Sequence, residues 1–181
     1  MKTSLILTLV GPDRPGLVSA VSARASLCGA NWMESRMAHL AGQFAGVLRL
    51  EVDAAELDAL EAALRGLESE GLRVAIARGG ALAAAEARRV CLDLVGHDRP
   101  GIVRDISTVL ARHGVSIEAL ETGCENASMS GEPLFRARAE LSVPAAADLA
   151  RIRADLEALA NELMVDLALD DAPAGRSVAA V

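Results

Sequence analysis

The chain has 181 residues and a formal net charge of −7 at pH 7, with 52% apolar and 24% charged residues. This length fits one ordinary domain or two small ones, and the composition is that of a globular protein. The acidic balance argues against a nucleic-acid-binding surface, which would need clustered Lys and Arg. The apolar run Ser4–Val10 is too short to span a membrane and lacks a signal-peptide cleavage site, so we expect a cytoplasmic protein.

The three cysteines are Cys28, Cys91 and Cys124, and they lie far apart in the sequence. They form no CxxC pair and have no histidine at metal-ligand spacing, so neither a disulfide framework nor a zinc site is indicated. We expect small buried thiols in a reducing compartment, and no metal.

The chain contains an internal repeat. The hexapeptide GPDRPG at Gly11–Gly16 recurs as GHDRPG at Gly96–Gly101. Apolar positions on both sides recur at the same spacing, and the difference in length between the copies falls mainly in Asn126–Gly131, a Ser/Gly/Asn stretch typical of a loop. Matching apolar positions around a loop of changed length indicate duplication of a folded unit.

Each copy has the same predicted order of elements, β-α-β-β-α-β. Apolar residues at strand and helix spacing carry this prediction. In the first copy the strands are Lys2–Val10, Asn31–Leu40, Gln43–Val52 and Leu72–Arg78, the helices are Pro15–Cys28 and Ala55–Glu70, and a turn lies at Ala41-Gly42. This order predicts an α+β fold of two ferredoxin-like modules, each a four-stranded antiparallel sheet with two helices on one face.

The predicted organisation is a first module over residues 1–79, a Gly- and Ala-rich linker over 80–87, a second module over 88–171 and a disordered tail over 172–181. The first strand also carries Ile6 and Val10 on the face opposite its main apolar row. We therefore expect the modules, or two chains, to pack together, which makes a homo-oligomer the expected state. Scattered apolar residues on the surface are the alternative.

The repeated loop joins the first strand of each copy to its first helix. Pro15 and Pro100 fit the first turn of a helix, and Asp13 and Asp98 are placed to cap its free amides. The glycines permit tight turns and close approach of a ligand, and a helix N-terminus suits a carboxylate such as that of a free amino acid. A plain capping turn is the alternative, although it requires neither an arginine nor the same hexapeptide twice.

Two polar positions near the loop are further candidates. Asn31 begins the second strand, where we expect it beside the loop, and its amide can both donate to and accept from a zwitterion. Ser116 takes this place in the second copy with less reach, so the first loop is the better candidate. An Asn that only closes the preceding turn is the alternative. His97 replaces Pro12 in the second loop, where it could contact a ligand or tune the site with pH.

No pattern in the sequence assembles a nucleophile and a base. It contains no G-x-S-x-G elbow, no H-E-x-x-H motif and no P-loop. His113 takes the helical position of Cys28, which indicates packing rather than chemistry. We therefore expect a protein that is not an enzyme and needs no cofactor.

The D-R-P-G loop within a βαββαβ unit resembles the ACT-domain family, and the resemblance covers both copies. Tandem ACT domains without an attached catalytic domain resemble the glycine cleavage system transcriptional repressor group. The stretch Cys28–Arg36 is similar to that group's pattern after the first helix, in which an Asn and a later Ser-Arg are typical. Trp32 and Met33 depart from the usual Ile-Glu, which Ile117 and Glu118 keep in the second copy.

The resemblance implies that free amino acids, glycine among them, bind near the strand–helix loops at an interface between two ACT units. It also implies a repressor that acts on a DNA-binding transcription activator rather than on DNA. An accessory subunit of an amino-acid or folate enzyme is the alternative, because similar modules precede the catalytic domains of formyltetrahydrofolate deformylases and some phosphoserine phosphatases. A structural dimerisation module is a third. The candidate ligand-binding residues, carried over by position, are Gly11, Pro12, Asp13, Arg14, Pro15, Gly16, Leu17, Asn31, Gly96, His97, Asp98, Arg99, Pro100, Gly101, Ile102 and Ser116.

Overall fold

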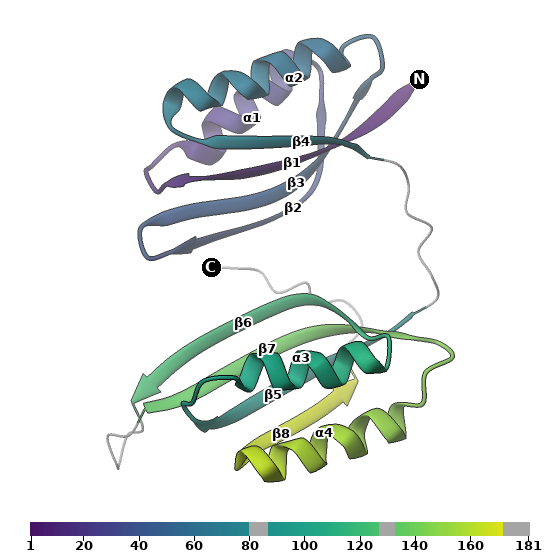
Figure 1. Cartoon of the computed structure of the whole chain (residues 1–181). Coiled ribbons are helices and arrows are strands. Elements are labelled where there is room, and N and C mark those ends of the chain that lie inside the picture. The colour runs from purple at the N-terminus through teal and green to yellow at the C-terminus, as the bar shows by residue number, and fades with distance from the viewer. Residues whose placement is uncertain (80–86, 127–132, 172–181) are drawn as a thin grey trace. The chain divides into compact units, whose positions relative to one another are not determined.

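The computed structural model describes residues 1–79, 87–126 and 133–171 (Figure 1). The chain divides into two compact units, one for each copy of the repeat, which we call module 1 and module 2. The first residue after the gap, Ala87, belongs to a strand rather than to the predicted linker. The rest of that linker, the predicted tail and most of the predicted loop at Asn126–Gly131 lie outside the described residues. No described helix is long and apolar enough to cross a membrane.

Module 1 has the predicted order of elements. Its sheet has the strand order β2-β3-β1-β4 with antiparallel neighbours, and both helices cover one face (Figure 1). The predicted second helix is interrupted near Gly66, where it tightens into a 3-10 turn. The elements are β1 (Lys2–Pro12), α1 (Leu17–Leu27), β2 (Asn31–Leu40), β3 (Gln43–Asp53), α2 (Leu57–Arg65), η1 (Gly66–Glu70) and β4 (Arg73–Gly79).

Module 2 repeats this architecture, with the strand order β6-β7-β5-β8. Each sheet is four-stranded and antiparallel with two helices, which confirms the predicted α+β fold of two ferredoxin-like modules. The elements are β5 (Ala87–His97), α3 (Ile102–Arg112), β6 (Ser116–Asn126), β7 (Pro133–Pro144), α4 (Leu149–Leu163) and β8 (Val165–Asp171).

The core of each module lies between the sheet and its helices and is almost entirely aliphatic. Leu5, Leu7 and Leu9 alternate along β1 and are fully buried against the helices. Val90, Leu92 and Leu94 take the same places along β5. Complete burial of such a side chain stabilises a fold by about 1.5–3 kcal/mol, so these central strands are firmly held. The loops that follow β1 and β5 therefore leave the sheet from fixed points.

The β2–β3 hairpin turns at the two predicted residues. Ala41 and Gly42 have φ values of 50° and 76°, which is the pair of positive φ angles that a type I′ turn requires. This turn matches the twist of the two strands it joins. It also brings the hairpin tip to the end of the sheet from which the loop after β1 emerges, because Gln43 pairs with Pro12.

Candidate functional site

The helices that follow the repeated loop begin at a left-handed glycine. Gly16 precedes α1 with φ 92°, and Gly101 precedes α3 with φ 102°. A side chain is strained in this conformation, which explains glycine at the end of both hexapeptides. Pro15 and Pro100 consequently lie before the N-cap residue. The prediction that they occupy the first helical turn was wrong.

The predicted aspartate caps are also wrong. No side chain accepts a hydrogen bond at the N-cap of α1 or α3, because the left-handed glycine turns the chain between each aspartate and its helix. The contrast is α4, where Oδ1 of Asp148 accepts from the amides of Ala150 and Arg151 at 3.0 and 3.2 Å. Like α1 and α3, α2 lacks such a cap. The first-turn amides of α1 and α3 are thus without a side-chain cap among the described residues.

Asp13 is held by the β2–β3 hairpin instead. Its amide donates to the carbonyl oxygen of Gly42 at 2.9 Å, and its Oδ2 lies 3.6 Å from Nε2 of His39. The loop of module 1 is therefore fixed to the edge of the sheet rather than to the helix.

Asp98 has the same arrangement in module 2. Its amide donates to the carbonyl oxygen of Pro133 at 3.2 Å, and its carboxylate accepts a hydrogen bond from the thiol of Cys124. Partial desolvation and the negative charge of Asp98 raise the pKa of this thiol. Sequence reasoning missed both His39 and Cys124 as neighbours of the loop. The repeat could have identified them, because the two residues occupy equivalent positions in the two copies. His39 pairs with Phe44, and Cys124 pairs with Phe135.

The first glycine of each hexapeptide allows two strands to approach closely. A Cβ atom on Gly11 would lie 2.7 Å from the carbonyl oxygen of Gly71, and one on Gly96 would lie 2.3 Å from Cγ1 of Val165. Neither distance is possible for a real Cβ without a shift of the neighbour. These glycines therefore bring the chain entering β4 or β8 against the start of the loop.

Arg14 is committed to an ion pair within module 1. Its Nη2 donates to the carbonyl oxygen and to Oε2 of Glu70, both at 3.1 Å. Arg24 of α1 binds the other carboxylate oxygen of Glu70 and donates to the carbonyl oxygen of Ala20. The two guanidinium groups, Arg24 first, lower the pKa of Glu70. The loop, α1 and η1 are thus tied together through one carboxylate.

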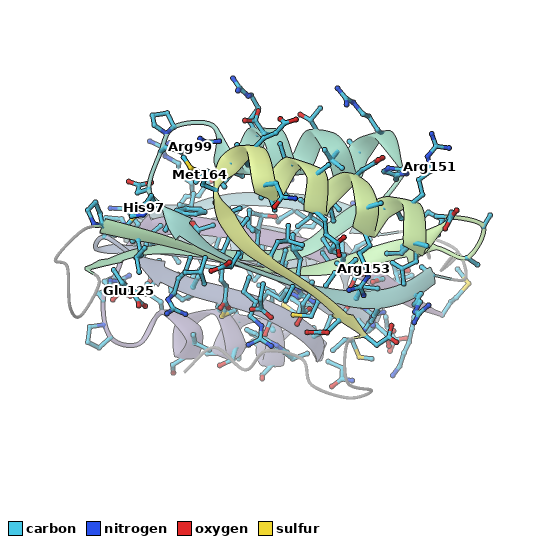
Figure 2. All side chains as sticks on the ribbon, turned by 90° about the horizontal axis from the view of Figure 1, so that it is seen from below. His97, Arg99, Glu125, Arg151, Arg153 and Met164 are labelled. Carbon is cyan, nitrogen blue, oxygen red and sulfur yellow. The ribbon has the colours of Figure 1, made fainter. Side chains whose placement is uncertain are left out.

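Arg99 has different surroundings in module 2. The equivalent of Glu70 is Leu163, since each precedes a residue with positive φ at the end of a helix, and the equivalent of Arg24 is Val109. Leu163 is buried and Val109 packs against the core, so neither offers Arg99 a charge. Figure 2 shows Arg99 and His97 at one end of the module, with Arg151 at the other. The two loops share the Asp-Arg-Pro-Gly sequence, but only in module 1 does a carboxylate stand at the position that pairs with the loop arginine.

Asn31 and Ser116 do not lie beside the loops of their own modules. Asn31 pairs with Glu51, and Glu51 pairs with Ser4 near the start of β1, whereas the loop follows the other end of that strand. Ser4 and Gly11 are seven residues apart, so at about 3.3 Å per strand residue Asn31 lies more than about 20 Å from Gly11. The prediction was wrong because β1 and β2 run in the same direction and α1 returns the chain to the far end of the sheet. Ser116, opposite Ser142, has the equivalent position.

The remaining candidate residues differ in exposure. Pro12 and His97 are the exposed last residues of β1 and β5, so their side chains are accessible at the loops. Leu17 and Ile102 are each only 3% exposed and anchor the helices in the core. Only their backbone amides, at the first helical position, are available to a ligand.

The cysteines are free and differ in environment. Cys91 is buried as predicted, but Cys28 is half-buried and Cys124 is exposed, which corrects the expectation of three buried thiols. Within the described residues, no group of three His, Cys, Asp or Glu could hold a metal ion. His113 is half-buried at the end of α3, and its Nε2 lies 2.7 Å from Oδ2 of Asp155 on α4.

Comparisons with known proteins agree with this architecture. Two ACT-domain models match residues 3–76 and 85–162. The glycine cleavage system transcriptional repressors of Escherichia coli (strain K12) and Shigella flexneri are each 26% identical to this chain over 161 residues, which cover 88% of the chain and 85% of each relative.

Solved structures show the same arrangement of elements. An unknown protein from Galdieria sulphuraria superimposes with a TM-score of 0.82 at 29% identity, over 96% of this chain and all of that one. A protein provisionally named a glycine cleavage system transcriptional repressor has this fold at a TM-score of 0.68 and 20% identity, over 94% of this chain and 97% of its own. The chain belongs to the ACT-domain family, as a tandem ACT regulatory protein related to the glycine cleavage system transcriptional repressor.

Proposed function

We propose that this chain is a cytoplasmic amino-acid sensor that binds a free amino acid at the repeated loops and regulates a partner protein. It is not itself an enzyme in this proposal. The partner is a DNA-binding transcription activator of glycine or one-carbon metabolism, engaged by protein contact. The relationship to glycine cleavage system repressors over most of the chain supports this choice of partner. The net charge of −7 supports contact with a protein rather than with DNA.

The observation that carries the ligand proposal is the pair of helix N-termini without side-chain caps. Gly16 and Gly101 begin α1 and α3 with no side-chain acceptor, while Asp148 caps α4 within the same chain. Unpaired amides and the positive end of the helix dipole favour a carboxylate at such a position. Every free amino acid carries one, and the same loop is present in both modules.

Self-association is part of the proposal. Asn31 and Ser116 lie at the far end of the sheet from the loops of their own modules, so neither can share a small ligand with that loop. An Asn or Ser contribution to the ligand therefore requires the loop of a different module, and in this proposal that module belongs to another copy of the chain. We expect amino-acid binding to stabilise a homo-oligomer. Size-exclusion chromatography with light-scattering detection would compare the molecular mass with and without ligand.

The direct test is a screen of the free amino acids, glycine first, by thermal shift and calorimetry on the full chain. A ligand that binds only the folded protein raises the unfolding temperature by mass action. The loop variants Gly16→Ala and Gly101→Ala should weaken the response of their own module, because each strains the residue that presents the helix amides. Gly123→Ala is the matched control, since a Cβ there meets nothing within 4 Å and φ is ordinary.

Affinity capture with the full chain as bait tests the partner. Recovery of a DNA-binding activator in an amino-acid-dependent manner would support the regulatory role. A screen in which no amino acid binds, with loop variants that behave as the wild type, would refute the sensor proposal. Recovery of a metabolic enzyme instead of a transcription factor would replace the proposed partner.

A further inference from the structure

The arginine of the first loop belongs to a network of three charged side chains. Arg14 and Arg24 bind the two carboxylate oxygens of Glu70, and Nη2 of Arg14 also donates to the carbonyl oxygen of that residue. These side chains come from the loop, from α1 and from the end of η1. Arg14 is 47% exposed, Arg24 26% and Glu70 31%, so the network is partly shielded from water.

Glu70 occupies Arg14 as the carboxylate of a bound molecule would. Hydrogen bonds between a guanidinium group and a carboxylate are charge-assisted and among the stronger ones in proteins. Because Glu70 belongs to the same chain, its effective concentration at Arg14 is on the order of millimolar or above. A free amino acid must therefore displace the Glu70 carboxylate before its own carboxylate can reach Arg14.

Module 2 has no such internal carboxylate at its loop arginine. Leu163 stands in the place of Glu70 and is only 7% exposed, and Val109 stands in the place of Arg24. Arg99 is half-buried, and within residues 1–79, 87–126 and 133–171 it makes no hydrogen bond or ion pair. Withdrawal of a charged group from water without a partner is unfavourable, so an anion at Arg99 would stabilise the second loop.

The carboxylates nearest to the second loop have other partners. Asp98 accepts a hydrogen bond from a thiol of β6, and Asp105 lies 2.8 Å from Nε of Arg104. The guanidinium group of Arg104 lies at the start of α3, because a Cβ atom on Gly101 would be 3.2 Å from its Nη2. The equivalent of Arg104 in α1 is Ser19, so the second loop has a cationic neighbour that the first one lacks.

We propose that the two loops have different roles: the second binds the carboxylate of the amino acid through Arg99, whereas Glu70 blocks the equivalent arginine of the first. This inference rests on the proposed function, and it narrows the binding to one site per chain. It reverses the preference for the first loop, which depended on Asn31, a residue at the far end of the sheet. The first loop is then a structural connection between β1, α1 and η1.

Calorimetry and NMR of the full chain test this assignment together. The free amino acids, glycine first, are titrated one at a time, and the backbone amides of Leu17 and Ile102 are followed. Each of these is the first helical residue after its loop. We expect one site per chain, with a shift of the Ile102 amide and none of the Leu17 amide.

Glu70→Gln tests the blocking role. This change retains the size of the side chain and removes the charge that holds Arg14. We expect a second site per chain and a shift of the Leu17 amide, and circular dichroism verifies that the variant folds. Glu68→Gln, which alters an exposed carboxylate of the same 3-10 turn, is the matched control and should keep a single site.

Arg99→Gln tests the binding role. We expect the affinity for the amino acid to fall by about tenfold or more, because a hydrogen bond to a charged group contributes about that factor. Arg151→Gln is the matched control, since Figure 2 shows Arg151 at the other end of the module, and it should bind as the wild type does.

The outcomes separate this inference from the proposed function. Equal shifts of the Leu17 and Ile102 amides in the wild type, wild-type affinity in Arg99→Gln, or a single site in Glu70→Gln would each overturn the inference and leave the sensor proposal intact. Failure of every amino acid to bind either the wild type or Glu70→Gln would refute both.

Discussion

Oδ2 of Asp13 and Nε2 of His39 lie 3.6 Å apart, which joins the repeated loop of module 1 to the edge strand β2. In module 2 the thiol of Cys124 on β6 meets Asp98 in the same way. The loop aspartate of each module is therefore positioned by the sheet edge, whereas the following helix is left without a side-chain cap. This division leaves the helix amides available to a ligand while the loop itself stays fixed.

Asp98→Asn should make Cys124 more reactive. Partial desolvation, together with the negative charge and hydrogen bond of Asp98, raises the pKa of the thiol. Removal of that charge therefore increases the thiolate fraction at pH 8. We expect alkylation of Cys124 to accelerate roughly twofold to fivefold, as measured by mass spectrometry of iodoacetamide-treated protein. Asp105→Asn, which removes a carboxylate paired with Arg104 on α3, is the control. An unchanged or slower rate in Asp98→Asn would contradict this contact.

Glu70→Gln should remove a pH-dependent part of the stability of module 1. Arg24 and Arg14 lower the pKa of Glu70 below its ordinary value of 4.5, so the folded state favours the charged carboxylate. The resulting stabilisation is fully present above pH 4.5 and is lost as the pH falls through the lower native pKa. The variant should be less stable than the wild type at pH 7, with the difference shrinking towards pH 3.

Urea unfolding at a series of pH values would measure this effect. Trp32 is the single tryptophan of the chain, so its fluorescence reports on module 1. Glu68→Gln, an exposed carboxylate of the same 3-10 turn, serves as the control. A difference between Glu70→Gln and wild type that stays constant from pH 7 to pH 3 would mean that the pair does not act through its charge.

The fold was predictable because it depends on periodic burial. Alternation at Leu5, Leu7 and Leu9 identifies β1, and the repeat of that pattern around a second hexapeptide identifies module 2. Strand ends were less predictable, since β1 continues to Pro12 and β5 to His97, inside the motif assigned to the loop. Pairing with β3 and β7 extends these two strands, and the residues Pro12 and His97 themselves give no signal of a strand.

The site was predictable only in part. The sequence identifies the loop, but a Pro-Gly pair fits either a helix start or a turn before one, and the φ of Gly16 decides between them. Topology alone could have placed Asn31 correctly. Because α1 runs back along the sheet after the loop, β2 must begin at the end of the sheet opposite the loop. The ion pair of Arg14 with Glu70 depends on the end of η1 and has no local signal.

Ala41→Asn should stabilise module 1. Ala41 holds φ at 50° in the first central position of the hairpin turn, a conformation that is unfavourable for alanine by about 1–2 kcal/mol. Asn tolerates it better, and Asn-Gly is the preferred pair in such turns. We expect a gain of roughly 0.5–1 kcal/mol in the free energy of unfolding, from urea titrations followed by Trp32 fluorescence. Gly42→Ala should have the opposite effect, and a destabilised Ala41→Asn would argue against the turn geometry.

Gly96→Ala should destabilise module 2, and Val165→Ala should partly rescue it. The added methyl group would lie 2.3 Å from Cγ1 of Val165, and overpacking of this kind typically costs about 1–3 kcal/mol. Truncation of Val165 removes the nearest clashing atom and leaves its Cβ at 2.8 Å, so the rescue should be partial and the double variant more stable than the sum of the two single changes predicts. The coupling comes from a double-mutant cycle of urea unfolding followed by circular dichroism.

Gly11→Ala provides the contrast that separates side-chain from backbone contact. Its added methyl group would lie 2.7 Å from the carbonyl oxygen of Gly71, which no side-chain truncation can remove. We therefore expect Gly11→Ala to be at least as destabilising as Gly96→Ala. The two variants differ in which change relieves the clash. Only movement of the chain entering β4 can accommodate the methyl group of Gly11→Ala. Strictly additive changes at Gly96 and Val165 would show that the glycine is required for a reason other than the approach of β8.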